Sequence, residues 1–405
     1  MRKLGFVDGS VASFADVRGS LQPSWKLRFA PRDRECLRAS GDLPRRRGAG
    51  HKSTQHRWGW VPSRELELIR KTAFAAACFA VAPQCLSGAA ATPMQAAQAP
   101  KVNLGLLHVQ VILDHLGFSP GVLDGKPGKS LSAALRGFQE SRGLPRTGHV
   151  DRATLAVLQT YAGWRATKTL RLTADALAGP YVDPLPTDPM RQAALPALGY
   201  RSPMEKLAEM FHTTPQVLLA LNSPQTRLAP GTPVVFPNAL PTSRAYSAKL
   251  PATWRATLNS LNVDANQPQG ASIVVDKSEQ LLRVLDAKGK LVAQFQATMG
   301  SEHDPLPIGA WKVQAFSYNP PFRYNPALFW DAKPGQAKAT LPPGPNGPVG
   351  VAWLDLNIPH YGIHGTAEPS TIGRAESHGC IRLTNWDVAR LALMIKPGTP
   401  AVFRE

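Results

Sequence analysis

The spacing of apolar residues changes once along this chain, from a helical period to a strand period. Between residues 104 and 161 apolar side chains recur every three or four positions, as at Leu131 and Leu135. From residue 271 onward they alternate with polar ones, for example over residues 291–297. Helices and strands require these two different periods, so one part of the chain must be helical and another mainly β. We therefore expect a multidomain α+β protein.

The positive charge of the chain is concentrated at its amino-terminal end. The formal net charge is +18, and residues 1–71 hold 16 Lys and Arg against 7 Asp and Glu, which is half of that excess. A basic arm for nucleic acid is one interpretation. However, residues 1–64 show neither helical nor strand periodicity. We interpret them as a doubtful basic extension that results from a mis-called start.

Residues 65–91 have the features of a secretory signal peptide. Arg70-Lys71 is followed by the apolar run 72–82 and by the small residues at 87–91. Basic, apolar and small-residue regions in this order are typical of such a peptide, which belongs at the amino terminus. We therefore expect export to the periplasm or cell wall. We expect no nucleic-acid partner, because cleavage would remove the basic arm.

After signal cleavage the chain would keep one cysteine and no membrane span. Cys36, Cys78 and Cys85 lie in the extension or the signal, which leaves only Cys380. A lone thiol has no partner within the chain, so we expect no structural disulfide. No apolar run reaches the ~18–20 residues that a spanning helix needs, so we expect no integral membrane span.

Changes in composition and period divide the exported part into five segments. We expect a linker at 92–103, three short helices at 104–162, a strand–helix–helix–strand module at 163–238, a second linker at 239–270 and a mainly-β domain at 271–405. The proline-rich stretches 319–326 and 341–348 are expected to be long surface loops.

Three histidines, His360, His364 and His378, lie close in the sequence to Cys380. A free thiol has a pKa of about 8.5, so it needs a base or a positive potential to act as a nucleophile at neutral pH. An imidazole supplies such a base. Thr384 is a predicted N-cap, and the dipole of the helix that it begins is expected to favour a thiolate at Cys380.

The same four side chains are of the types that bind zinc. A histidine pair four positions apart binds a metal from one face of a helix. Pro359, Gly362 and Gly365 disfavour a helix around His360 and His364. We therefore favour a nucleophile–base pair over a metal site.

The segment from His364 through Ser377-His378-Gly379-Cys380-Ile381-Arg382 resembles the signature of the YkuD-type L,D-transpeptidase family. Members have a histidine followed, after a gap in the mid-teens, by Ser/Thr-His-Gly-Cys, and His364 and Cys380 are 16 positions apart here. The resemblance covers about 271–404. Residues 104–162 resemble a small peptidoglycan-binding domain, and residues 163–238 resemble a LysM module, which binds N-acetylglucosamine chains.

The resemblance implies a mainly-β catalytic domain that forms bonds between peptidoglycan stem peptides. Cys380 would be the nucleophile and would attack the bond before the terminal D-alanine of a tetrapeptide donor. His364 would be the base, oriented by the backbone carbonyl of Gly365 rather than by a carboxylate. His378, Gly379 and Cys380 would contribute oxyanion contacts. No metal, nucleotide or other cofactor is implied, since the thioester retains the energy of the old peptide bond.

The resemblance also implies substrate contacts from Tyr361, Ser377 and Arg382. The expected partners are peptidoglycan stem peptides and glycan, and the acceptor amine belongs to a second stem peptide, a lipoprotein lysine or a free D-amino acid. Two alternatives stay open. An L,D-carboxypeptidase would hydrolyse the same donor with the same residues, and a non-catalytic wall-binding protein would use only the binding modules.

Overall fold

The computed structural model describes residues 6–7, 101–375 and 377–405. These residues belong to one compact unit. Apart from residues 6–7, the predicted extension at 1–64 lies outside the described residues. So do the predicted signal peptide at 65–91 and most of the predicted linker at 92–103.

The first described part consists of short helices around one apolar core. They are α1 (Leu104–His115), α2 (Lys129–Ser141) and α3 (Arg152–Leu158), followed by the 3-10 turn η1 (Gln159–Tyr161). Asn103 and Asp151 begin α1 and α3, because each side chain accepts a hydrogen bond from a backbone N–H of the first turn. The apolar stripe that contains Leu131 and Leu135 is buried, so the prediction of a three-helix domain is confirmed.

The middle module, residues 163–238, contains the predicted order of strand, helix, helix and strand. Its strands β2 (Thr167–Leu172) and β3 (Pro233–Pro237) pair antiparallel, and β1 (Phe6–Val7) pairs with β2. Its helices are α4 (Ala174–Leu177), α5 (Pro189–Ala193), α6 (Pro203–Met210) and α7 (Pro215–Leu221). The side chain of Ser202 caps α6 and that of Thr214 caps α7. Helices α4 and α5 were not expected, and the resemblance to LysM stays a prediction.

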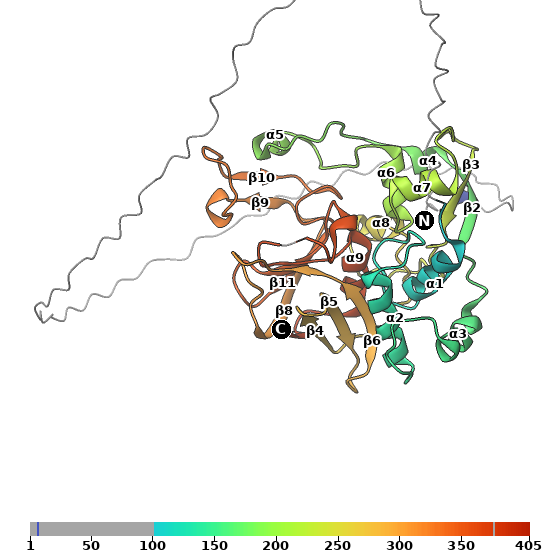
Figure 1. The fold of residues 1–405 in the computed structure, drawn as a ribbon. Coiled ribbons are helices and arrows are strands. Elements are labelled where there is room, and N and C mark those ends of the chain that lie inside the picture. Colours follow the sequence, from blue (N-terminus) through green and yellow to red (C-terminus); the bar gives the residue numbers. More distant parts are fainter. Residues whose placement is uncertain (1–5, 8–100, 376) are drawn as a thin grey trace, which may run out of the picture. The chain divides into compact units, whose positions relative to one another are not determined.

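A nine-stranded sheet forms the carboxyl-terminal part and is nearly closed (Figure 1). The strand order is β6-β5-β4-β14-β8-β11-β12-β13-β7. The strands at its two ends, β6 and β7, follow one another in the chain, so the sheet must curl until its ends approach. The strands are β4 (Ser272–Asp276), β5 (Leu281–Leu285), β6 (Leu291–Gln296), β7 (Thr298–Met299), β8 (Gly309–Tyr318), β11 (Ala352–Leu356), β12 (Gly362–His364), β13 (Ile381–Arg382) and β14 (Pro400–Arg404).

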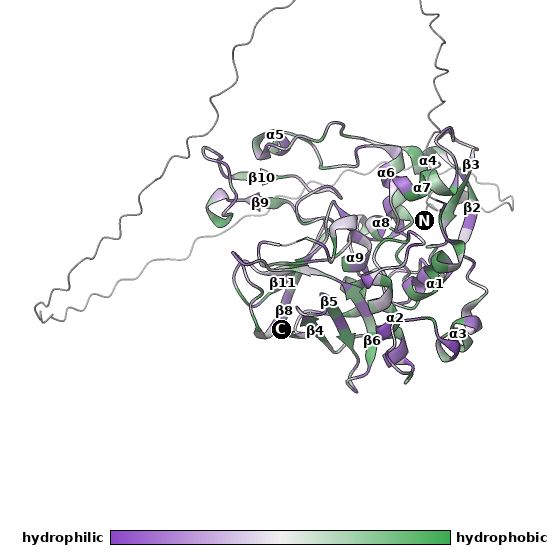
Figure 2. Ribbon diagram, in the orientation of Figure 1, coloured by the Kyte–Doolittle hydropathy of each residue, from purple (hydrophilic) through white to green (hydrophobic). Residues whose placement is uncertain are grey.

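The core of this part lies between the sheet and two helices. Helix α9 (Asn385–Met394) begins at the predicted N-cap Thr384, and its Trp386 is fully buried. Strands such as β11 and β14 bury alternate residues, and Figure 2 shows hydrophobic and hydrophilic residues mixed along the strands. The mainly-β prediction is therefore confirmed.

The segment 239–270 is not the simple linker that the sequence analysis predicted. It contains α8 (Ala252–Ser260), whose Trp254 and Leu258 are fully buried in the core of the carboxyl-terminal part. Leu261 continues the same face and is also buried. This spacing is a helical apolar stripe, which the composition of the segment had obscured.

The first proline-rich stretch is also more ordered than expected. Its strand β9 (Phe322–Tyr324) pairs with β10 (Ala339–Leu341) in a separate two-stranded sheet, with the 3-10 turn η2 (Pro326–Leu328) between them. We call residues 319–341 the flap. Helix α5 of the middle module contacts β10, and the two lie side by side in Figure 1. A further 3-10 turn, η3 (Pro369–Thr371), lies in the loop after β12.

The three-helix domain covers the edge strand β6. Backbone hydrogen bonds join Gln294 of β6 to Gly117 and Ser119, and Phe118 forms a parallel bridge with Gln294. The side chain of Gln294 also donates to the carbonyl of Ala133 in α2, at 2.8 Å. An uncovered edge strand invites pairing with another chain, so this contact both joins the two domains and shields the sheet.

A buried polar cluster joins all three parts of the chain. Asp114 of α1 accepts hydrogen bonds from His212, which follows α6, and from Arg390 of α9, each at 2.9 Å. Nearby, Ser119 donates to Asp387 at 2.8 Å. Burial alone would raise the pKa of Asp114, but the charges of His212 and Arg390 lower it below its usual value. The carboxylate is therefore ionised and fully engaged.

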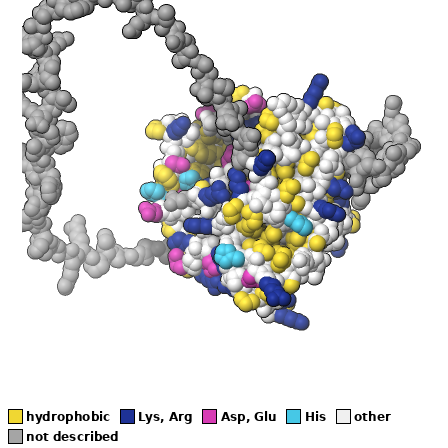
Figure 3. Space-filling model, turned by 45° about the vertical axis from the view of Figure 1, so that its right-hand side comes forward, with side chains coloured by type: hydrophobic (Ala, Val, Ile, Leu, Met, Phe, Trp, Pro, Cys, Tyr) yellow, Lys and Arg dark blue, Asp and Glu magenta, His cyan; other side chains and the backbone are white. Residues whose placement is uncertain are grey.

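Surface charge is dispersed on the face of the described part that Figure 3 shows. In Figure 3, Lys and Arg side chains are spread among hydrophobic and uncharged ones over the visible face, with Asp and Glu between them. Among the described residues, no helix combines the length and the apolar character that crossing a membrane requires.

Replacing Asp114 by alanine is expected to lower the free energy of unfolding by about 3–5 kcal/mol, because the Arg390 guanidinium would be left buried without its partner. The exposed pair of Lys277 and Glu405 provides the control, and Lys277→Ala is expected to cost about 0–1 kcal/mol. Denaturant unfolding of the two variants measures both values. Equal effects would contradict a structural role for the buried cluster.

Candidate active site

Two short strands place the predicted nucleophile and base on one face of the sheet. β12 and β13 run parallel, with Ile363 opposite Ile381 and His364 opposite Arg382. Ile363 and Ile381 are fully buried in the core. Because side chains alternate along a strand, His364 and Arg382 face the other way. Cys380, two positions before Arg382, is on the same side.

That face lines a cleft with a volume of about 870 Å³. Six of the lining residues belong to the predicted site or its sequence neighbourhood: His360, Tyr361, His364, His378, Cys380 and Arg382. The flap contributes Phe322, Arg323 and Phe329 to the lining as well. The fold thus brings together most of the residues that the sequence pattern singled out.

His364 is held in one orientation within the cleft. Its Nδ1 lies 2.7 Å from the carbonyl oxygen of Gly365, and its ring stacks on Trp353 with centroids 5.4 Å apart. A carbonyl can only accept, so Nδ1 donates and Nε2 is left as the acceptor. Burial lowers the pKa of His364 to about 3, and the charge of Arg382 lowers it as well. The imidazole is therefore neutral and able to accept a proton.

Cys380 is a neutral thiol in the absence of substrate. Burial raises the pKa of Cys380 to about 11, although the backbone N–H of Gly362 and the charge of Arg382 act in the opposite direction. Its Sγ lies 3.6 Å from the carbonyl oxygen of His360 as a weak donor. The expectation that the α9 dipole favours a thiolate is therefore wrong, because desolvation of the sulfur outweighs the positive potential.

Ser377 and Gly379 shape the turn that presents the cysteine. The Ser377 hydroxyl is buried, donates to the Cys380 carbonyl at 2.6 Å and accepts from the Gly300 N–H at 2.7 Å. Ser377 does not line the cleft, so its geometry supports a positioning role rather than the predicted substrate contact. Gly379 has φ +87°, and a Cβ there would lie 2.6 Å from the Tyr361 ring. Only glycine fits that turn.

His378 connects the cysteine turn to the flap. Its Nε2 lies 3.0 Å from the carboxylate of Asp331, and its ring meets Phe329 edge-on at 5.1 Å. Its Nδ1 lies 3.4 Å from the guanidinium of Arg382. Sequence analysis missed Phe329 and Asp331, because nothing local shows that a loop 47 positions before His378 folds over it. The predicted oxyanion contacts stay a prediction.

The four side chains of types that bind zinc, namely those of His360, His364, His378 and Cys380, do not converge on one point. The backbone carbonyl of His360, and not its ring, lies near the Cys380 sulfur. The ring of His378 faces Asp331. In the described part of the chain, no group of three or more His, Cys, Asp or Glu side chains is arranged to hold a metal ion. Cys380 and His364, the predicted nucleophile and base, both line the cleft.

Two family models match the chain. The YkuD model, described as the L,D-transpeptidase catalytic domain, matches residues 270–403. The PG_binding_1 model, described as "Putative peptidoglycan binding domain", matches residues 105–158. Both matches lie where the sequence resemblances were found.

Several curated relatives are described as putative L,D-transpeptidases. The chain is 56% identical over 57 residues to "Putative L,D-transpeptidase YkuD" of Bacillus licheniformis, which covers 14% of this chain and 34% of that protein. It is 28% identical over 169 residues to "Putative L,D-transpeptidase in ATP synthase subunits region ORF 5" of Fuscovulum blasticum, which covers 40% of this chain and 86% of that protein. The chain thus spans 34% of the length of the Bacillus YkuD relatives.

Solved structures give weaker likenesses. An L,D-transpeptidase from Xylanimonas cellulosilytica is 15% identical with a TM-score of 0.31, over 76% of this chain and 99% of that one. An L,D-transpeptidase from Mycobacterium smegmatis is 21% identical with a TM-score of 0.27, over 33% of this chain and 58% of that one.

The neutral thiol–imidazole pair predicts how the reactivity of Cys380 changes with pH. Alkylation of Cys380 by iodoacetamide should be slow at pH 7 and rise steeply only above about pH 9, because the thiol pKa is about 11. Acylation assisted by His364 should instead be nearly constant between about pH 5 and pH 9, since His364 titrates near pH 3. Peptide mass spectrometry of the Cys380 peptide measures both rates. An alkylation midpoint near pH 6 would show that a thiolate–imidazolium pair forms instead.

Proposed function

We propose that the protein is an exported cysteine L,D-transpeptidase, because residues 270–403 match the L,D-transpeptidase catalytic domain model and residues 105–158 match the putative peptidoglycan-binding domain model. It acylates itself with a peptidoglycan tetrapeptide and transfers the acyl group to an amine. The product is a cross-link between stem peptides or an attachment to the wall. The predicted signal peptide and the peptidoglycan-binding domain support a periplasmic or cell-wall location.

One observation carries this proposal. His364 and Cys380 line the same cleft, and the hydrogen bond from His364 Nδ1 to the Gly365 carbonyl leaves Nε2 as the proton acceptor. In the familiar Ser-His-Asp arrangement a carboxylate performs this orienting task. A backbone carbonyl orients the ring equally well but adds no negative charge, which fits an imidazole that is neutral at rest.

The chemistry follows from these two groups. As the Cys380 sulfur attacks the peptide carbonyl carbon, its proton passes to His364 Nε2 and the carbonyl oxygen becomes an oxyanion. The C–N bond then breaks, D-alanine leaves as an amine with the proton from His364, and a thioester remains on Cys380. An acceptor amine attacks the thioester and gives its proton to His364, and the proton returns to the departing sulfur. Every proton and bond is accounted for.

The lining of the cleft offers side chains that could contact the substrate. Arg382 and Tyr361 line the cleft beside Cys380, and Arg323 of the flap lines it as well. Stem peptides carry carboxylates, which guanidinium groups bind well. The cleft is large enough for an extended peptide. A lipoprotein lysine or a free D-amino acid in place of a second stem peptide would use the same thioester.

Acylation at Cys380 tests the proposal directly. Intact-mass spectrometry of the mature protein with a carbapenem is expected to show one covalent adduct on the wild type, because such a strained acyl donor replaces the stem peptide. Cys380→Ala should show none. His364→Ala should be acylated at least about 100-fold more slowly, since it lacks the base. An adduct that persists in Cys380→Ala, or a folded wild type that never reacts, would refute the proposal.

Muropeptide analysis separates transfer from hydrolysis. Cells or isolated sacculi treated with the wild type are expected to gain 3-3 cross-links, which Cys380→Ala cannot form. Tripeptides without cross-links would instead identify an L,D-carboxypeptidase. Unchanged muropeptides together with retained binding to sacculi would identify a non-catalytic wall-binding protein.

A further inference from the structure

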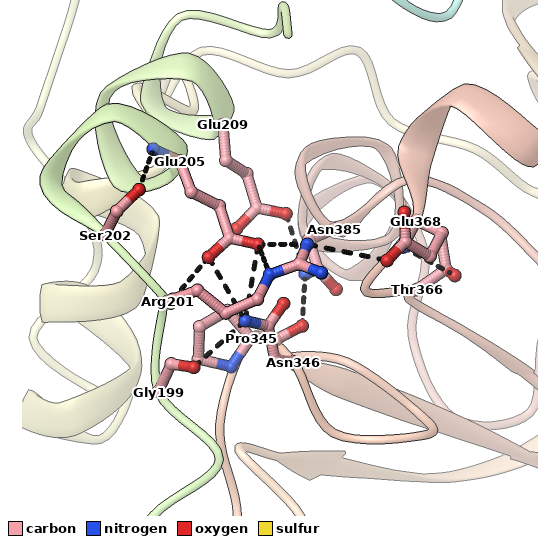
Figure 4. A network of polar contacts seen from close by, with 10 residues as sticks. All are labelled: Gly199, Arg201, Ser202, Glu205, Glu209, Pro345, Asn346, Thr366, Glu368 and Asn385. Atoms are coloured by element: carbon pink, nitrogen blue, oxygen red, sulfur yellow. Dashed lines mark hydrogen bonds and ion pairs between the residues drawn. The ribbon is translucent and has the colours of Figure 1, made fainter. Parts of the chain in front are cut away.

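The middle module contacts the catalytic domain through one face of α6. Figure 4 shows Glu205 and Glu209 reaching from α6 toward the catalytic loops. At the exposed rim, Arg201 pairs with Glu205 and Glu368. Asn346 donates to the carbonyl of Gly199 at 3.0 Å. These contacts join the two parts near the solvent.

Glu209 makes a different contact in the interior of this interface. It is 7% exposed, and its Oε1 accepts a hydrogen bond from Asn385 Nδ2 at 2.8 Å. Asn385 is the first residue of α9 and is fully buried. Its Nδ2 also donates to the carbonyl of Pro345 at 3.0 Å, and its Oδ1 accepts from the N–H of Val351 at 3.1 Å. Both polar atoms of the side chain are thus engaged, and Glu209 is one of three partners that hold the amide in place.

The Asn385 amide in turn rests directly on the residue that orients the catalytic base. A Cβ at Gly365 would lie 2.1 Å from Asn385 Oδ1, so the amide packs against the bare Cα of Gly365. The N–H of Gly365 donates to the carbonyl of Val349, which lies two residues before Val351. The carbonyl of Gly365 accepts the hydrogen bond from His364 Nδ1. Any shift of Asn385 therefore moves the acceptor that sets the His364 ring.

We propose that Glu209 is a positioning residue for catalysis, through which the middle module holds Asn385 and Gly365 and thereby orients His364. The inference rests on the proposed function, since it assigns His364 the role of base. It makes the middle module a working part of the catalytic unit, in addition to any contact that the module makes with glycan.

A glutamine should serve at position 209 almost as well as the native residue. Burial raises the pKa of Glu209 to about 7, against hydrogen bonds from Tyr200 and Asn385 that lower it. The neutral and the ionised carboxyl both accept a hydrogen bond through an oxygen, and so does the Gln carbonyl. Glu209→Ala, by contrast, removes one of the three hydrogen bonds that hold the Asn385 amide, so the amide is held less tightly.

The test compares three variants in the full mature chain. Glu209→Ala is expected to lower the maximal rate of carbapenem acylation by about tenfold to a hundredfold, with little change in the half-saturating concentration, because only the geometry of the base is altered. Glu209→Gln should retain most of the rate. Arg201→Ala breaks the same interface at its exposed rim and should acylate like the wild type. Thermal unfolding of each variant checks that the fold is intact.

A charge exchange tests the contact itself. Asn385→Asp places a carboxyl against Glu209 and should slow acylation, while the double variant Glu209→Gln with Asn385→Asp regains a donor–acceptor pair and should recover part of the rate.

Equal acylation by Glu209→Ala and the wild type would overturn the inference while leaving the proposed function intact. A wild type that is never acylated would remove the proposed function itself. If Arg201→Ala lowered the acylation rate as much as Glu209→Ala, Glu209 would be a general interface contact and not a positioning residue.

Discussion

The parallel pairing of β12 with β13 decides where every reactive side chain lies. Each strand is only two or three residues long, yet their register sets His364 beside Arg382 and turns Ile363 and Ile381 into the core. A slip of one residue would exchange these faces, and the reactive side chains would point into the core. The register is held from both sides, since β7 pairs with β13 and β11 pairs with β12.

Burial gives the site its electrostatic character. Cys380 and His364 both sit in surroundings that disfavour charge, and each is neutral at rest. A buried ion pair would carry a large desolvation cost. The site avoids that cost until a substrate arrives, when charge develops only along the reaction path. The thiol is thereby also kept poorly reactive toward small electrophiles.

Local patterns allowed much of this structure to be predicted, and long-range contacts account for the rest. The N-cap Thr384 and the apolar stripe that contains Leu131 and Leu135 are properties of neighbouring residues, and these elements were located correctly. The pairing of His364 with Cys380 was predicted from the sequence motif alone. In contrast, the flap over His378 and the contact of Glu209 with Asn385 join residues 47 and 176 positions apart. A single sequence contains no signal for such pairs.

The bridge between Phe118 and Gln294 has a consequence for how the chain can be divided. The match to the catalytic-domain model begins at residue 270, but the edge strand β6 takes a hydrogen-bonding neighbour from before that residue. A fragment that begins at 270 would expose the backbone of β6 to other copies of itself. We expect such a fragment to self-associate through this edge, whereas a fragment that begins before α1 keeps the edge covered.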